Sequence, residues 1–385
     1  MDRCVVFALS LLVSVAAFAQ DPLRNLSGTS GTPGPSPWVR SGAFFHAFSA
    51  HVTHVSEVGP DDPRSEVFST NWIALGLQHD FGNRFFLLAR GRVSLEPYTI
   101  PEDDGYPQTL QYVSAEGGGP LIDRMRPHDL VGEAAVQVGF RPSASTLLHV
   151  YAAPVGDPAL GAPPAELRAS GIDFAEAPFS YDIAETFHDS TSVVTAGFAS
   201  KWINVDASVF HDAVTFGEHT EIPDGDIDSS SARVTLTPTP NLALQISRGT
   251  LGEDANEREV SSASLSYGTK NVALTALWTR REAQTSPSET AYGFEVALRG
   301  SRNTFMGRAE WVDRPLGFPE TLDPTATEQA THFAVGYIFD VLTASRYRAG
   351  IGVNVDYHTQ SHELDERYGH KPQAIYAFVR LRSGS

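Results

Sequence analysis

Two runs decide the fold: T-H-F-A-V-G-Y-I-F-D-V at residues 331–341 and Y-R-A-G-I-G-V-N-V-D-Y at residues 347–357. In each run, apolar or aromatic residues recur at every second position. A period of two places successive side chains on opposite faces of a β-strand. Each run is also about ten residues long, whereas strands usually contain about five or six.

Aromatic residues lie at both ends of the apolar row in the second run, at Tyr347 and Tyr357. A strand that crosses a bilayer has about 9–11 residues, with apolar side chains toward lipid and aromatic rings at the two water boundaries. The two runs therefore predict one hairpin of an outer-membrane β-barrel, in which polar residues such as Asn354 face the interior.

The rest of the chain repeats this pattern, and we predict about sixteen antiparallel strands. They lie near 38–55, 67–80, 84–98, 130–142, 145–155, 191–200, 202–213, 230–239, 241–251, 258–268, 271–283, 289–300, 303–315, 331–343, 346–359 and 373–383. Short turns such as Phe81-Gly82-Asn83 alternate with long polar loops such as 99–129 and 156–190. Short periplasmic turns and long extracellular loops are typical of outer-membrane barrels. The predicted fold is therefore all-β, a single transmembrane barrel.

The alternation leaves the last strand ambiguous. Ile375, Ala377 and Val379 alternate there with Tyr376, Phe378 and Arg380. Both rows contain large apolar side chains, so either face is compatible with lipid.

The chain begins with features of an exported protein. Arg3 precedes an apolar run, and Ala17-Phe18-Ala19 forms a small-x-small cleavage site. We therefore predict a signal peptide at residues 1–19, a flexible periplasmic tail at 20–36 and the barrel at 37–385. The expected location is the outer membrane of a Gram-negative bacterium, with lipid and the barrel-assembly machinery as partners.

Composition narrows the classes of partner. The chain has 46 acidic and 28 basic residues, a formal net charge of −18. An acidic balance disfavours nucleic acid as a partner. No stretch of 18 consecutive apolar residues follows the leader, so no transmembrane helix is predicted.

The predicted inward positions carry charges of both signs. They are Arg90, Arg92, Arg233, Arg308 and Arg348, together with Glu96, Glu133, Asp206, Glu295, Glu310 and Asp356. Such a lining sets the preference of a channel for ions or small polar solutes. The alternative is that the charges neutralise one another and brace a plugged barrel. The sequence leaves both alternatives open.

The loop at residues 99–129 is far longer than a hairpin requires, and loops of this length are usually functional or disordered. Apolar residues such as Tyr106 give it contacts for a fixed position, and a charged segment ends it. We predict that it folds inward as a constriction loop; packing on the outer rim is the alternative. The charged segment consists of Asp123, Arg124, Arg126, His128 and Asp129.

The sequence assigns no catalytic residue, no metal site and no cofactor. The run 224–228 begins like a calcium loop, but Ser229 and Thr235 stand where such a loop requires Gly and Glu. His362 and His370 share an acidic loop in which metal binding is weighed against scattered polar histidines. A hydrolase in the barrel wall is the less favoured reading, because neighbours within 188–190 point to opposite faces of a strand.

Three segments carry a family resemblance: 105–111 (G-Y-P-Q-T-L-Q), 120–130 (P-L-I-D-R-M-R-P-H-D-L) and 151–161 (Y-A-A-P-V-G-D-P-A-L-G). With these motifs the chain resembles a family of uncharacterised Gram-negative outer-membrane β-barrel proteins. The resemblance implies a barrel and carries no catalytic residues. Some relatives appear beside metal-efflux genes, which implies a link to metal homeostasis. Relatives tend to have Gln-His where this chain has Met125-Arg126, which removes one candidate ligand.

The sequence therefore favours a porin-like channel for ions or small polar solutes that is not an enzyme. The alternative is a plugged structural or interaction barrel that acts through its surface loops, with a link to metal homeostasis. A barrel-embedded hydrolase is the third candidate. The solute and the oligomeric state stay open.

Overall fold

The structure is a computed structural model of the whole chain. It describes residues 42–54, 65–100, 129–143, 145–185, 190–200, 202–212, 219–239, 241–252, 257–283, 287–315, 327–344, 347–360, 362, 365 and 369–383. The predicted signal peptide and periplasmic tail lie outside these residues.

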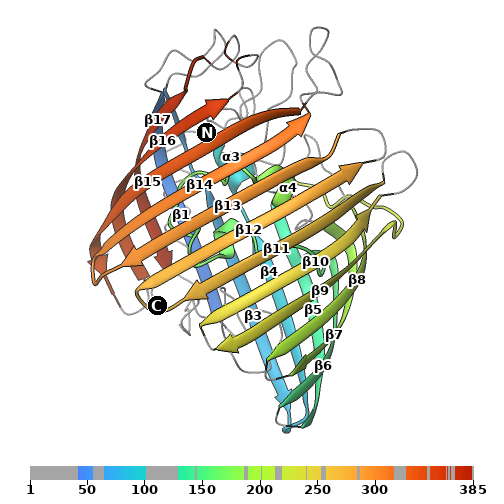
Figure 1. The fold of residues 1–385 in the computed structure, drawn as a ribbon. Helices are drawn as coiled ribbons and strands as arrows, with labels where there is room; N and C mark the ends of the chain where they lie inside the picture. The colour runs from blue at the N-terminus through green and yellow to red at the C-terminus, as the bar shows by residue number, and fades with distance from the viewer. Residues whose placement is uncertain are drawn as a thin grey trace.

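The described residues form one closed antiparallel sheet. Its strands are β1 (Gly42–His54), β2 (Ser65–Phe68), β3 (Asn71–Phe81), β4 (Phe85–Val93), β5 (Val131–Ser143), β6 (Thr146–Gly156), β7 (Ser190–Ser200), β8 (Ile203–His211), β9 (Ser229–Thr239), β10 (Leu242–Leu251), β11 (Arg258–Gly268), β12 (Val272–Ala283), β13 (Glu289–Arg299), β14 (Asn303–Pro315), β15 (Thr327–Thr343), β16 (Tyr347–Gln360) and β17 (Gln373–Ser383). Strand β1 pairs with β17, which closes the barrel (Figure 1).

Strands β2 and β3 together occupy one position in the barrel wall. Both pair with β1, β2 through Ala50–Thr53 and β3 through Gly42–Ala47. The two residues between these strands still bond to β1. Phe48 N donates to Thr70 O at 2.8 Å, and Ser69 Oγ donates to Phe48 O at 2.6 Å. The seventeen strands thus fill sixteen positions, and the predicted fold class is confirmed.

One predicted strand end is wrong. The alternation extends the strand that begins at residue 84 as far as 98, but β4 ends at Val93 and a short helix, α3 (Glu96–Thr99), follows. Pro97 lies in the first turn of this helix, where a proline is tolerated because its missing N–H has no partner there. Glu96 is therefore a helix residue, and it accepts a hydrogen bond from Asn71 N at 3.3 Å.

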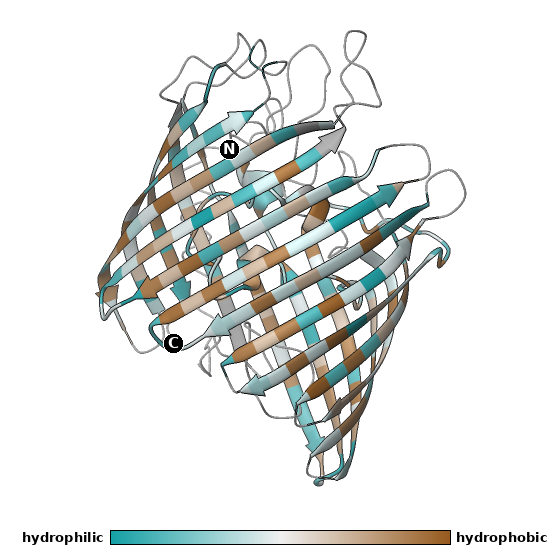
Figure 2. Ribbon diagram, viewed as in Figure 1, coloured by the Kyte–Doolittle hydropathy of each residue, from teal (hydrophilic) through white to brown (hydrophobic). Residues whose placement is uncertain are grey.

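The two faces of the strands differ as the alternation predicts. Ile351 on β16 is 54 % exposed, whereas Asn354 and Asp356 on the same strand are fully buried. Hydrophobic and hydrophilic bands alternate along the strands drawn in front in Figure 2. The structure also resolves the ambiguous last strand, because Val379 is exposed and Arg380 is fully buried.

A long connection between β6 and β7 lies inside the barrel. We call residues 157–185 the inner loop; it contains a single 3₁₀ turn, η1 (Ala165–Leu167), and a short helix, α4 (Tyr181–Ala184). Its apolar side chains join wall residues in buried clusters, as Leu167 does with Trp72 and Phe174 with Phe378. The inner loop is visible in green behind the front strands in Figure 1. No helix in the described part of the chain is long and apolar enough to cross a membrane.

We expect Ile351→Arg to destabilise the barrel by about 2–4 kcal/mol, because the residue lies near the middle of the lipid-facing row. The matched control is Thr343→Arg, on an exposed position at the end of β15, where the cost near the interface is about 0–1 kcal/mol. Urea unfolding of protein refolded into lipid vesicles gives both values. Equal losses at the two positions would contradict the assigned depth of Ile351.

Candidate functional site

The inner loop is held to the barrel wall by buried ion pairs. Arg168 Nε and Nη2 donate to the two carboxylate oxygens of Glu295 on β13 at 3.0 and 2.8 Å. Arg168 Nη1 also donates to Glu185 Oε1 at 2.6 Å, farther along the same loop. A two-pronged guanidinium–carboxylate contact fixes distance and orientation together. Burial lowers the pKa of Arg168, but Glu185 and Glu295 outweigh it and raise the pKa above its usual value.

The backbone of the inner loop approaches this ion pair closely. Ser170 Oγ donates to Glu295 Oε2 at 2.9 Å and lies 2.7 Å from Thr275 Oγ1, whose hydroxyl can donate to it. A Cβ atom at Gly171 would lie 2.7 Å from the carbonyl oxygen of Ala165 and 3.0 Å from Glu295 Oε2. Glycine is therefore required at this position for the loop to dock.

A second set of ion pairs surrounds Asp173. Its carboxylate accepts from Arg299 Nε at 2.9 Å and from Arg380 Nη1. Arg382 Nε lies 3.8 Å away. Burial alone raises the pKa of Asp173, but Arg382, Arg299 and Arg380 outweigh it and hold the pKa well below its usual range. Asp173 is therefore ionised at neutral pH and attracts three guanidinium groups to one point of the inner loop.

Glu176 lies in a more acidic environment. Arg308 Nη1 is 3.6 Å from its Oε1, and the Arg308 guanidinium lies over the Phe174 ring at 4.1 Å from the centroid. Neither carboxylate oxygen of Glu176 has a hydrogen-bond partner among the described residues. Burial first, and then the nearby Asp356 carboxylate, raise the pKa of Glu176 to about 8. Around Glu176, the nearby carboxyl groups outnumber the guanidinium groups that could neutralise them.

The end of the inner loop fixes Glu310 on β14. Phe179 N and Ser180 N donate to its two carboxylate oxygens at 2.8 and 3.0 Å, and Ser180 Oγ adds a third contact at 2.6 Å. On its other side Glu310 Oε2 contacts His332 Nδ1 at 2.9 Å. Glu310 therefore links the inner loop to the adjacent strand β15.

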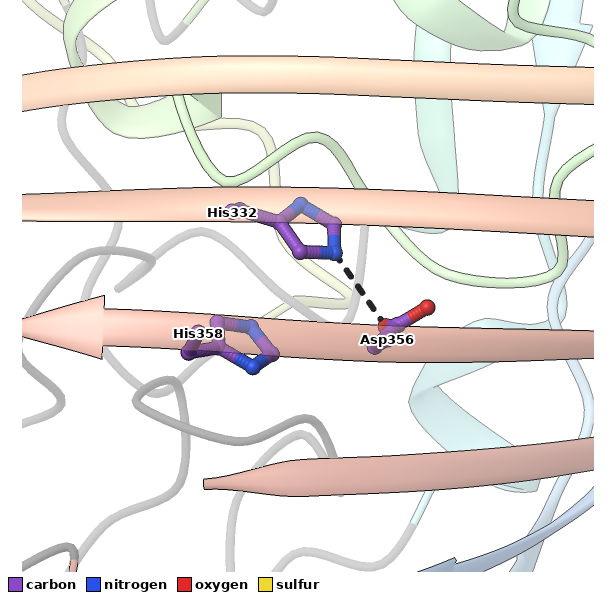
Figure 3. Close-up of side chains that lie close together, drawn as sticks. All are labelled: His332, Asp356 and His358. Atoms are coloured by element: carbon purple, nitrogen blue, oxygen red, sulfur yellow. Dashed lines mark ion pairs between the residues drawn. The ribbon is translucent and has the colours of Figure 1, made fainter. Parts of the chain in front are cut away.

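His332 belongs to a buried group with Asp356 and His358 (Figure 3). His332 and His358 are register partners on β15 and β16, and their rings stack with centroids 4.6 Å apart. His332 Nε2 lies 3.3 Å from Asp356 Oδ2. One ligand atom from each residue lies within 4.8 Å of the other two, so the described residues hold a candidate metal site here.

The predicted lining residues lie in ion pairs or hydrogen bonds. Beside Glu295, Arg308, Glu310 and Asp356 described above, Arg90 pairs with Glu133, Arg92 with Asp157, Arg233 with Asp206, Arg348 with Asp340, and Glu96 bonds Asn71 from α3. The structure thus brings Glu295, Arg308, Glu310 and Asp356 together against the inner loop, and Arg92 contacts the start of that loop through Asp157. The others form separate pairs, so their role in lining a channel stays a prediction.

The predicted constriction loop lies almost wholly outside the described residues. Tyr106, Asp123, Arg124, Arg126 and His128 belong to that part. Asp129 is described, and its Oδ1 lies 2.9 Å from His219 Nδ1. In the described part of the chain, the segment inside the barrel is the inner loop, which the sequence places among the long extracellular loops.

Several residues of the site were missed from the sequence. Arg168, Asp173 and Glu176 belong to an irregular loop, where no periodicity assigns a direction. A signal did exist for Arg299, four residues after Glu295 in one strand, and for His332 and His358. An even spacing places two strand residues on one face, so His358 faces inward with Asp356.

The other groups weighed from the sequence lie outside this site. Asp228 of the acidic run contacts His211 Nδ1 at 2.9 Å. His362 and His370 both contact Asp365, at 2.7 and 3.1 Å, on the exposed loop before β17. Of the hydrolase candidates, Ser190 begins β7, whereas residues 188 and 189 lie outside the described part.

Comparisons with known proteins show the fold. No family model and no curated protein matches the chain. An anion-selective porin from Comamonas acidovorans matches over 88% of this chain and 98% of its own, with a TM-score of 0.54 and 10% identity. Salmonella typhi OmpF in complex with daunomycin covers 88% and 96%, with a TM-score of 0.53 and 9% identity. A loop-deletion mutant of OmpT, an outer-membrane protein of Vibrio cholerae, covers 88% and 98%, with a TM-score of 0.51 and 10% identity.

These likenesses define the class of the fold as that of the porins and related outer-membrane barrels. In this chain, ion pairs fix the inner loop to β13, β14 and β17.

We expect Asp173→Asn to loosen the inner loop at neutral pH. The substitution leaves three buried guanidinium groups without this carboxylate, and breaking a buried ion pair costs about 3–5 kcal/mol. Arg168 is a trypsin site that docking buries, so tryptic cleavage after Arg168 should become faster in the variant. Asp80→Asn, at a half-exposed turn pair with Arg141, is the matched control and should leave the rate unchanged. A rate equal to wild type in Asp173→Asn would contradict the docking role.

The same residue gives a pH dependence. Because the folded-state pKa of Asp173 is depressed, its contribution to stability is present above the ordinary carboxyl pKa of about 3.9. It is lost as the pH falls through the folded value. The free energy of unfolding in urea should therefore fall less steeply with acid in Asp173→Asn than in wild type. Identical slopes below about pH 4 would show that Asp173 has no depressed pKa.

Proposed function

We propose that this protein is a porin-like channel of the bacterial outer membrane that passes ions or small polar solutes, with the inner loop setting the width of the passage. The observation that carries the proposal is the loop's position. It leaves the wall at the paired residues Gly156 and Ser190 and crosses the interior, where its charged side chains meet wall charges of both signs. The chain acts on its solute by size and charge, and lipid and the barrel-assembly machinery are its expected partners.

A polar region beside the inner loop supports a passage. Arg233, Gln245 and Ser264 lie on inward positions of β9, β10 and β11 yet are only half-buried. Gln245 Nε2 donates to Thr235 Oγ1 at 3.4 Å, and Ser264 Oγ donates to Gln245 Oε1 at 3.3 Å. The described residues therefore leave this polar wall uncovered, as a path for hydrated solutes requires.

The inner loop also favours a second function, a barrel closed by its own loop that acts through its surface. Residues from Asp157 to Leu160 and from Ala169 to Tyr181 are buried, and hydrogen bonds from Ala159 N to Ser208 Oγ and from Gly161 N to Ser247 Oγ extend the contacts to β8 and β10. Such contacts on several sides of the barrel are typical of a plug. Electrical measurement separates the two functions.

Removing the inner loop should raise the conductance several-fold. Because Gly156 and Ser190 are paired in the sheet, residues 158–188 can be replaced by a short hairpin turn without disturbing the ladder. Single-channel currents in planar bilayers are recorded for wild type and the deletion variant. Wild type should conduct weakly and the deletion variant strongly, because the largest obstacle in the described interior is gone.

A single substitution provides a milder version of this test. Gly171→Val should also raise the conductance, because its side chain would overlap the Ala165 carbonyl and displace the loop. Gly300→Val is the control, since the nearest atom to its Cβ, Asn303 O, is 3.7 Å away. Currents in the deletion variant alone would favour the closed barrel, and no current in any variant would reject the channel.

A further inference from the structure

The group formed by His332, Asp356 and His358 has the composition of a transition-metal site. Two imidazoles and a carboxylate suit a borderline divalent ion such as Zn²⁺, whereas Mg²⁺ and Ca²⁺ prefer oxygen ligands alone. Ligand atoms bound to one zinc ion at about 2.0–2.2 Å lie about 3.3 Å apart. His332 Nε2 and Asp356 Oδ2 are already 3.3 Å apart, and the three ligand atoms lie within 4.8 Å of one another. To complete the set, His358 would have to turn out of its parallel stack with His332, so that a ring nitrogen points at the same ion.

The surroundings orient the ligands as the surroundings of metal sites do. A metal-binding histidine usually contacts a carboxylate through its other ring nitrogen, which fixes the tautomer and the ring plane. Glu310 occupies this position beside His332 Nδ1, and three hydrogen bonds from Phe179 and Ser180 hold it in place. His332 Nε2 then faces Asp356, whose Oδ2 accepts no hydrogen bond among the described residues (Figure 3).

The charge of the region also favours a cation. Four buried carboxylates face two guanidinium groups in the connected set Glu185, Glu295, Glu310, Asp356, Arg168 and Arg308. Glu176, also buried here, is largely neutral at neutral pH because its pKa is raised to about 8. Burying uncompensated charge is costly. A divalent ion at this site would compensate part of that negative charge.

We propose that His332, Asp356 and His358 bind one divalent transition-metal ion of the zinc class on the inner wall of the barrel. Glu310 is a positioning residue for His332. Since Phe179 and Ser180 of the inner loop hold Glu310, a bound ion also strengthens the docking of this loop.

An ion can approach from the loop before β17. His358 N donates to Pro372 O at 2.9 Å, so the base of this loop adjoins the site. His370 lies two residues before Pro372, and His370 and His362 have side chains 72% and 94% exposed, both against Asp365. We expect an ion from the solvent to meet these exposed groups first, before it reaches the buried site.

Zinc binding to the purified full-length chain in detergent tests the proposal. Equilibrium dialysis against ZnCl₂ should show one tightly held ion per barrel, and MgCl₂ should not compete for it. Asp356→Asn and His358→Gln should each weaken binding at least about tenfold, and Glu310→Gln about 10–100-fold. Bound Co²⁺ provides a second readout, because its visible spectrum changes when an imidazole ligand is lost.

Two control variants separate this site from other histidines. His149→Gln removes a buried histidine that pairs with Asp206 elsewhere in the barrel, and it should bind zinc like wild type. The double variant His362→Gln/His370→Gln removes the exposed pair, and it should keep the tight ion while binding it more slowly. Urea unfolding checks that each variant is folded, and zinc should raise the stability of wild type but not of Asp356→Asn.

Three results would overturn the proposal. They are no zinc bound by wild type, undiminished affinity in Asp356→Asn and His358→Gln, and loss of the ion only in the variant without the exposed pair. None of them depends on conductance, so the metal site and the channel can fail separately.

Discussion

Closure of the sheet between β1 and β17 is the constraint on which the rest of the structure depends. A strand in lipid has no water to bond its backbone, so an open edge is excluded and every strand needs two neighbours. The register from His46 with Arg382 to His54 with Ala374 meets this requirement. A closed barrel then separates each strand into two rows, one for lipid and one for the interior. Every inward side chain must find its partners in that interior.

The inner loop provides many of these partners. Guanidinium groups from the wall cannot be left buried without carboxylates, and Asp173 from the loop pairs with Arg299 and Arg380 of the wall. In turn, Glu295 and Glu310 on the wall take hydrogen bonds from the loop. The wall and the loop are therefore electrostatically incomplete without each other, which is a stronger reason for docking than the apolar contacts alone.

The fold could be predicted from the sequence because lipid imposes the same alternation on every strand. Ile351 and Tyr357 follow it, and even the ambiguous strand β17 is explained once Arg380 has carboxylate partners inside. Glu96 was predicted as a strand residue because the alternation of apolar and polar residues continues to that position. In the structure it belongs to a helix, whose first turn contains Pro97.

The site was harder to predict than the fold, since a loop has no periodicity and its direction depends on distant partners. Arg168 and Glu295 are 127 residues apart in the chain. Nothing local connects them. His332 and His358 were within reach of the sequence, because both fall on inward positions of adjacent strands. Their pairing side by side depends on the register of β15 against β16. That register is set by the length of the turn between the two strands, which the sequence alone does not fix.

The interior charges are sorted along the barrel. Arg299, Arg348, Arg380 and Arg382, with Asp173 and Asp340, form a set with more guanidinium groups than carboxylates toward the short turns. The acidic set around Glu310 and Asp356 lies toward the long loops, near Pro372. Asp173 and Glu176 are only three residues apart, so the inner loop joins an electropositive region to an electronegative one.

The basic set and the acidic set attract each other, which lowers the free-energy cost of burying both. A cation bound in the acidic set would remove part of this attraction. A zinc-class ion at His332 would therefore do two opposing things: strengthen the local contact of Glu310 with the inner loop and leave the excess guanidinium charge less compensated. Coulomb attraction falls with distance, so the effect of the ion on the nearby Glu310 contact would exceed its effect on the more distant guanidinium set. With the ion bound, the loop would be more firmly docked, and the region toward the short turns would attract anions more.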